Sequence, residues 1–171
     1  MKKLILLLPL LLVLNACTGT RIGTGGITYN PYADYVLVEK SQNKMYLVKD
    51  SKVMRAYNIS LGGNPRGHKQ QEGDLRTPEG LYMLTYKNEN SSFYRSIKIN
   101  YPNAQDVARA HARGVSPGGD IVIHGLPNAE GNYLGPLDPV NWTQGCVAVR
   151  NHEMDEIFRL VQIPTPIEIR P

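Results

Sequence analysis

From about position 34 onward, short apolar runs alternate with polar residues and are broken every few positions by Gly, Pro, Asn or Ser. Alternation with a period of two, bounded by turn-forming residues, is typical of half-buried strands. Residues 41–44, Ser-Gln-Asn-Lys, separate the first two runs and predict a hairpin between them. The pattern predicts strands at 35–38, 45–48, 53–61, 80–86, 96–100, 120–124, 146–150 and 166–170.

Two segments have helical character instead. Residues 103–113 are Ala-rich and end before Gly114, and a second helix is predicted to begin with Asn151 as its N-cap and to end before Pro164. Acidic residues follow Asn151, where the helix dipole favours negative charge. Many short strands with about two short helices indicate a mainly β protein, a mixed β-sandwich or barrel-like fold, and not alternating βαβ units.

The first 16 residues have the pattern of an export signal. Two lysines precede an apolar core at 4–14, which is too short to span a bilayer because a span takes about 20 apolar residues. The core leads into Leu14-Asn15-Ala16-Cys17, which resembles a bacterial lipobox, although Asn15 is uncommon in that motif. We therefore predict a lipoprotein signal peptide over 1–16 and a membrane lipid anchor on Cys17. The alternative is an ordinary cleaved signal beside an incidental Cys.

The rest of the chain divides into a tether and one domain. Residues 17–33 are rich in Gly and Thr, which predicts a flexible tether. Residues 34–171 have the size of a single domain and enough chain to bury a core without disulfides. Thr18 follows the predicted lipidation site, where an Asp would indicate retention in the inner membrane of a Gram-negative cell. The predicted location is therefore the periplasm, anchored to the outer membrane.

Charge and cysteine content narrow the possible functions. The formal charge of +4 falls to +2 without the two lysines of the leader, and no basic run is present, so nucleic acid is excluded as a partner. The chain has two cysteines. Lipidation of Cys17 would leave Cys146 unpaired in a compartment where disulfides are common. A lone Cys is usually a buried small hydrophobe, so the neighbouring residues decide the interpretation.

His124 ends one predicted strand and Cys146 begins another, with a long irregular segment between them. A thiol is only partly ionised near neutral pH, so a nucleophilic Cys needs a base, and His has a suitable pKa. Gly145 lets a carbonyl approach the backbone, where the N–H groups of Gly145 and Cys146 can face an oxyanion. Gly125 leaves a backbone carbonyl open to hold the other imidazole nitrogen.

These segments resemble a known family. His124-Gly125, a variable loop and then Thr143-Gln144-Gly145-Cys146 are similar to the signature of the L,D-transpeptidase catalytic domain (YkuD-like) family. Residues 77–80, Thr-Pro-Glu-Gly, resemble a second family segment, and the likeness extends over 34–170. The resemblance implies a mixed β-sandwich in which Cys146 is the nucleophile and His124 the base. It implies no metal and no organic cofactor.

The resemblance also implies the substrate, which is the tetrapeptide stem of peptidoglycan. Cys146 would form a thioester with the third residue of the stem and release D-Ala. The acyl acceptor would be a second stem or a cell-wall-attached lipoprotein. Gly125 also belongs to the expected oxyanion site. Many family members have an Arg at the position of Ala148, and the nearest Arg here is Arg150. The residues expected to contact the substrate are Trp142, Thr143, Gln144 and Arg150, although Trp142 and Tyr133 are equally well explained as loop anchors.

Several alternatives stay open. Water can resolve the same thioester, which would make the protein an L,D-carboxypeptidase or endopeptidase. A papain-like or NlpC-type peptidase needs its His well downstream of the Cys, and here only His152 follows, close by. A zinc peptidase would combine His68, His111 and His152 with His124, but their spacing is not that of zinc ligands. A non-catalytic peptidoglycan-binding lipoprotein would not need both Cys146 and His124.

Overall fold

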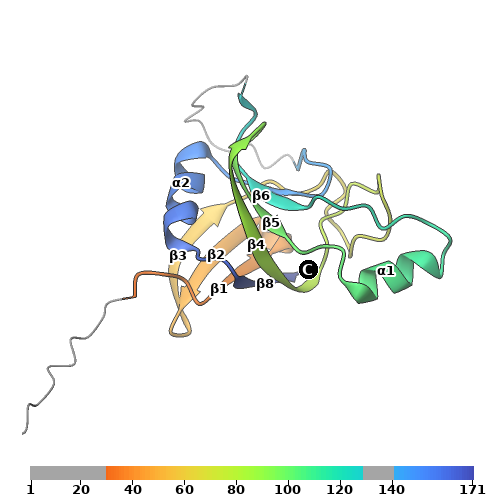
Figure 1. Cartoon of the computed structure of the whole chain (residues 1–171), viewed down its shortest axis with the longest axis horizontal. Helices are drawn as coiled ribbons and strands as arrows, with labels where there is room; N and C mark the ends of the chain where they lie inside the picture. Colours follow the sequence, from red (N-terminus) through yellow and green to blue (C-terminus); the bar gives the residue numbers. More distant parts are fainter. Residues whose placement is uncertain (1–29, 129–140) are drawn as a thin grey trace, which may run out of the picture. The chain divides into compact units, whose positions relative to one another are not determined.

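The computed structural model describes residues 30–128 and 141–171. Residues 31–171 belong to one compact unit, which contains an eight-stranded sheet and two α-helices (Figure 1). The predicted signal peptide over 1–16, the lipid anchor on Cys17, most of the tether over 17–33, and Tyr133 lie outside the described residues and stay predictions. Within the described ranges, none of the helices is long and apolar enough to cross a membrane.

The sheet is mixed, with the strand order β3-β2-β1-β8-β4-β5-β6-β7. The pairs β1–β8 and β6–β7 are parallel and the other neighbouring pairs are antiparallel. In chain order the elements are β1 (Tyr35–Glu39), the 3-10 turn η1 (Lys40–Gln42), β2 (Lys44–Lys49), β3 (Lys52–Asn58), β4 (Gly80–Ser91), β5 (Tyr94–Ile99), α1 (Ala104–His111), β6 (Val122–His124), β7 (Val147–Ala148), α2 (Asn151–Leu160) and β8 (Thr165–Arg170).

The last strand of the chain joins the two halves of the sheet. β8 lies between β1 and β4, pairing parallel to the first and antiparallel to the second. The N-terminal hairpin β1–β2 and the strand β3 therefore form one side of the sheet, and β4 to β7 form the other. The predicted hairpin and the predicted mainly β fold with two short helices are both confirmed.

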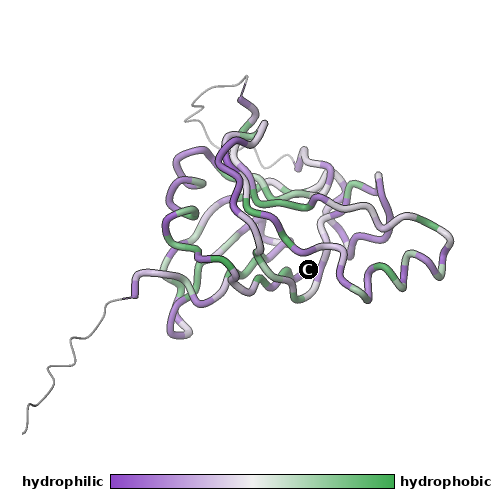
Figure 2. The backbone as a smooth tube through the Cα atoms, in the orientation of Figure 1, coloured by the Kyte–Doolittle hydropathy of each residue, from purple (hydrophilic) through white to green (hydrophobic). Residues whose placement is uncertain are grey.

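The core is formed where the apolar faces of the strands meet α2. Alternate residues of β1 and β8 are buried, with Val36, Val38 and Ile167 fully excluded from solvent. From α2, Met154 and Ile157 are fully buried against the same cluster. Figure 2 shows the matching pattern of hydrophobic stretches along the central strands. This core holds β5, β6 and β7 in place, and the strand that ends in His124 is among them.

Several predicted strand boundaries differ from the structure, and in the two largest differences strand pairing overrides local propensity. The strands predicted over 120–124 and 146–150 are shorter, at Val122–His124 and Val147–Ala148. β4 continues to Ser91 through the polar residues 87–91, which pair with β5. The run predicted over 53–61 ends as a strand at Asn58, because Ser60 leaves β2 and forms a bridge with Ala148. That bridge connects the β3 segment to β7, next to Cys146.

The prediction of Asn151 as the N-cap of the second helix is wrong. Arg150 is the N-cap of α2, and Asn151 is its first helical residue. The Asn151 side chain instead accepts a hydrogen bond at 2.8 Å from the backbone N–H of Leu126. The amide therefore fixes the chain just after His124, a long-range contact that local capping rules do not predict.

Candidate active site

A cavity of about 660 Å³ lies over the end of β6 and the start of β7. The lining residues come from Phe93 of the β4–β5 turn and from three segments of the chain, 69–73, 118–124 and 142–146, of which the second includes β6. Both residues with predicted chemistry, Cys146 and His124, are among them. Segments far apart in the sequence thus meet around one thiol and one imidazole.

His124 is held in one tautomer by its own neighbour. It ends β6, is only 3% exposed, and its Nδ1 lies 2.6 Å from the carbonyl oxygen of Gly125. Because a carbonyl oxygen only accepts hydrogen bonds, Nδ1 carries the proton and Nε2 of the neutral ring keeps its lone pair. Burial lowers the pKa of His124, with the Gly125 hydrogen bond acting in the opposite direction. The ring is therefore a neutral base near pH 7.

The packing around position 125 requires a glycine there. A Cβ at this position would lie 2.6 Å from Asn151 Oδ1 and 2.9 Å from Tyr94 Cβ. Its backbone N–H donates to the carbonyl oxygens of Phe93 and Arg95, both at 3.1 Å. The β4–β5 turn and α2 together fix the Gly125 peptide, and its carbonyl holds the imidazole as the sequence predicted.

Two aromatic side chains surround the imidazole. The ring of Phe93 lies 4.7 Å from that of His124, and the ring of Trp142 lies 5.7 Å from it, edge to face. Phe93 and Trp142 are also stacked on each other at 6.2 Å. Trp142 lines the cavity and is 41% exposed. Phe93 was missed by sequence reasoning, because a single Phe in a polar turn carries no spacing signal.

Cys146 lies immediately before β7 and its side chain is partly buried in the cavity wall. Its Sγ donates a long hydrogen bond of 3.6 Å to the carbonyl oxygen of Asp120. Burial raises the pKa of the thiol, while the Val122 backbone N–H and the positive charge of Lys69 lower it by less. In the resting state the thiol and the imidazole are therefore both neutral.

Thr143 organises the turn that presents the thiol. Its buried Oγ1 accepts from the Gly145 N–H at 3.1 Å and donates to the Cys146 carbonyl at 2.8 Å. The Gly145 N–H, predicted to face an oxyanion, is thus already bonded within the turn. The Cys146 N–H makes no hydrogen bond within residues 30–128 and 141–171. It is the better placed of the two donors for an oxyanion.

The other predicted contact residues divide into two groups. Gln144 is exposed and lines the cavity with Trp142 and Thr143. Arg150 is not part of the lining, and its guanidinium bonds to Glu153 at 3.3 Å at the start of α2. Ala148 is fully buried in β7. Within the described ranges, no group of three His, Cys, Asp or Glu side chains is placed to hold a metal ion.

Two lining segments were not predicted from the sequence. Residues 118–120, Gly-Gly-Asp, provide the carbonyl that accepts from the thiol. Residues 69–73 bring Lys69 and Glu72 into the cavity wall. The glycines in both segments signalled turns, but nothing local connects those turns to Cys146.

The alkylation rate of Cys146 should report the raised thiol pKa. We expect its rate with iodoacetamide to keep rising at a pH where an exposed cysteine, with a pKa near 8.5, has levelled off. The rate is measured by mass spectrometry of the Cys146 peptide, which separates it from Cys17. A plateau near neutral pH would indicate a preformed thiolate–imidazolium pair and contradict this description of the resting state.

A family model and two sequence relatives all match this chain to the same protein family. A family model described as the L,D-transpeptidase catalytic domain matches residues 33–169. An Escherichia coli K12 protein provisionally named L,D-transpeptidase YafK is 34% identical over 112 residues, which is 64% of this chain and 37% of that protein. A Bacillus subtilis 168 protein provisionally named L,D-transpeptidase YqjB is 26% identical over 145 residues, covering 81% of this chain and 72% of that protein.

A solved structure is also similar to this chain. The helical cell shape determining protein Pgp2 from Campylobacter jejuni superposes with a TM-score of 0.59 at 29% identity, over 81% of this chain and 49% of that chain. The present chain spans less than half the length of the Escherichia coli and Campylobacter proteins.

Proposed function

The chain belongs to the L,D-transpeptidase catalytic domain family, and we propose that it transfers acyl groups on the stem peptides of peptidoglycan through a thioester on Cys146. The observation that carries the proposal is the presence of Cys146 and His124 in one cavity, with His124 Nε2 left unprotonated by the Nδ1 hydrogen bond to Gly125. Because peptidoglycan lies in the cell envelope, the proposed place of action is there.

The first half-reaction forms the thioester. The Cys146 thiol transfers its proton to His124 Nε2, and the thiolate attacks the carbonyl carbon of the third, L-configured residue of the stem. The Cys146 backbone N–H is the donor for the oxyanion of the tetrahedral intermediate. The carbon–nitrogen bond to D-alanine then breaks, and the leaving nitrogen takes the proton from His124.

The second half-reaction returns the enzyme to its starting state. An acceptor amine attacks the thioester carbonyl, His124 takes a proton from that amine, and the thiolate leaves and is reprotonated. The product is a new amide bond, to a second stem or to a cell-wall-attached lipoprotein. Water in place of the amine gives a tripeptide stem with a free carboxylate, which is carboxypeptidase chemistry on the same thioester.

Muropeptide analysis tests the proposal. We expect the purified protein, incubated with tetrapeptide muropeptides, to release D-alanine and to yield either cross-linked dimers or tripeptides, as resolved by mass spectrometry. Prior alkylation of Cys146 should stop product formation, while a metal chelator should leave it unchanged. Unaltered muropeptides, or turnover that stops only with the chelator, would contradict a cysteine acyl transferase.

A further inference from the structure

A lysine side chain lines the cavity. Among the described residues that line it, Lys69 is the single Lys or Arg. The Arg found in many family members two residues after the Cys is replaced by the fully buried Ala148, and Arg150 bonds to Glu153 outside the lining. Any anionic group that enters the cavity beside Cys146 therefore meets positive charge at Lys69.

The Lys69 ammonium is buried but not saturated. The residue is 4% exposed, and its Nζ bonds to Asp74 Oδ1 at 2.8 Å and to the Gln71 carbonyl oxygen at 3.1 Å. An ammonium has three N–H donors, so these two contacts leave a third donor for a ligand. Because a buried charge is costly without partners, these two hydrogen bonds keep the Lys69 ammonium at its position in the cavity wall.

The Asp74 carboxylate, which pairs with Lys69, also accepts hydrogen bonds from the backbone. Asp74 accepts hydrogen bonds from the N–H groups of Gln70, Gln71 and Arg76 at 2.6, 3.1 and 3.0 Å. These bonds, together with Lys69, hold the pKa of Asp74 below its ordinary value despite burial. The Asp74 charge is shared among four donors and therefore neutralises Lys69 incompletely. The Lys69 charge accordingly acts on the thiol, whose pKa it lowers.

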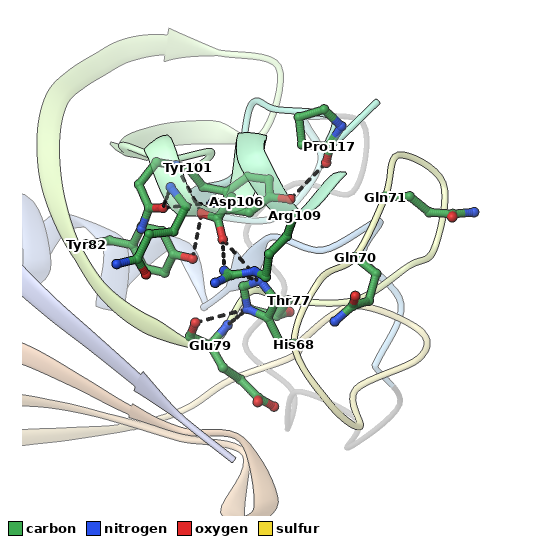
Figure 3. A network of polar contacts seen from close by, with 12 residues as sticks. His68, Gln70, Gln71, Thr77, Glu79, Tyr82, Tyr101, Asp106, Arg109 and Pro117 are labelled. Atoms are coloured by element: carbon green, nitrogen blue, oxygen red, sulfur yellow. Dashed lines mark hydrogen bonds and ion pairs between the residues drawn. The ribbon is translucent and has the colours of Figure 1, made fainter. Parts of the chain in front are cut away.

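A second network fixes the residue before Lys69. His68 Nε2 lies 3.1 Å from the buried Asp106 carboxylate, and the Glu79 N–H donates to His68 Nδ1 at 3.0 Å. Asp106 also accepts from Tyr82 and Arg109, so the cluster connects β4 and α1 to the loop (Figure 3). With His68 and Asp74 both anchored, the Lys69 side chain is preorganised at the cavity wall.

We propose that Lys69 binds the free carboxylate of the terminal D-residue of the stem, and so selects uncapped tetrapeptides over cross-linked ones. This rests on the proposed function. The departing D-residue carries its carboxylate on the carbon next to the scissile nitrogen, so a thiol and a carboxylate-binding cation must lie in the same small cavity, as Cys146 and Lys69 do. In a cross-linked stem that carboxylate is an amide, which offers no negative charge to an ammonium.

The acidic residues in the lining do not remove this preference. Glu72 is exposed to solvent, which screens its charge, and the Asp120 carboxylate is 92% exposed and paired with Lys98 at 3.0 Å. Lys69 is the buried charge of the three, and a buried charge interacts more strongly because water screens it less.

The test compares two tetrapeptide stems that differ only at the end, one with a free D-alanine carboxylate and one with D-alanine amide. For the wild-type protein we expect kcat/KM to favour the acid by about 10- to 100-fold, the effect of one charged hydrogen bond. Lys69→Met should reduce this ratio to near one and Lys69→Arg should keep part of it. Lys44→Met removes an equal charge from a half-buried side chain of β2, which is not part of the cavity lining, and should keep the wild-type ratio.

The ratio separates recognition from damage, because a disordered loop lowers kcat/KM for both stems equally. A wild-type protein that turns over both stems with a ratio near one would overturn the inference without any variant, and so would a wild-type ratio in Lys69→Met. A wild-type protein that acts on neither stem would instead overturn the proposed function.

Discussion

Replacing Cys146 by alanine is expected to lower the turnover of stem peptides by about 10⁴-fold or more, to the background of the assay. The reason is that the thioester cannot form without the thiol. Among the described residues that line the cavity, the one other thiol or hydroxyl is that of Thr143, which is engaged within its own turn. Release of D-alanine, measured by mass spectrometry, reports the loss.

The same variant should remain folded. Within the described residues, the polar contacts of the thiol are a long hydrogen bond to the Asp120 carbonyl oxygen and the Val122 backbone N–H. Its removal should therefore change the free energy of unfolding by less than about 1 kcal/mol. Cys17→Ala, which removes the other cysteine of the chain, is the matched control and should keep wild-type turnover in solution. Wild-type turnover by Cys146→Ala would refute the assignment of the nucleophile.

An inhibitor provides an independent readout of the same residue. The family resemblance implies that carbapenems open their ring on the nucleophilic Cys. The wild-type protein should therefore gain the mass of one drug on the Cys146 peptide, and Cys146→Ala should gain none. An adduct that maps to another residue would contradict the mechanism even if turnover were lost.

Much of the fold could be predicted because its signals are local. Alternation of apolar residues identified the strands, and the Ala-rich run over 103–113 identified α1, which Asn103 caps through its own side chain. The insertion of β8 between β1 and β4 could not be predicted, because Val36 and Ile167 pair across most of the chain and either strand fits several partners.

The candidate site also has some features that local motifs predict and others that depend on distant contacts. The presence of His124 and Cys146 in one cavity and the hydrogen bond of the Gly125 carbonyl to His124 follow from short motifs with a chemical reason. The wall formed by Lys69, Phe93 and residues 118–120 depends on loops whose positions are set by distant contacts, such as His68 with Asp106. The hydrogen bond from the Gly145 N–H to the buried Thr143 hydroxyl was also not predicted, and the oxyanion role of Gly145 stays a prediction.

The backbone conformation of Gly145 explains why a glycine precedes Cys146. It has φ +131°, a conformation that side chains with a Cβ rarely adopt, and a Cβ there would lie 2.6 Å from the Arg76 carbonyl oxygen and 3.1 Å from Ile121 Cδ1. The first contact is with backbone, which cannot rotate away. The close approach fixes the 142–146 turn against the loop that carries Lys69 and Asp74.

Gly145→Ala is therefore expected to lower the free energy of unfolding by about 2–4 kcal/mol and kcat/KM by about 100-fold or more, because the turn must shift and carry the thiol with it. Urea unfolding and D-alanine release measure the two effects. Gly119→Ala is the matched control: Gly119 also lines the cavity, but a Cβ there meets nothing within 4 Å and its φ lies outside the left-handed region. That variant should remain within about 1 kcal/mol of the wild type. If Gly145→Ala retained the stability and turnover of Gly119→Ala, the close contact with Arg76 could not be what positions Cys146.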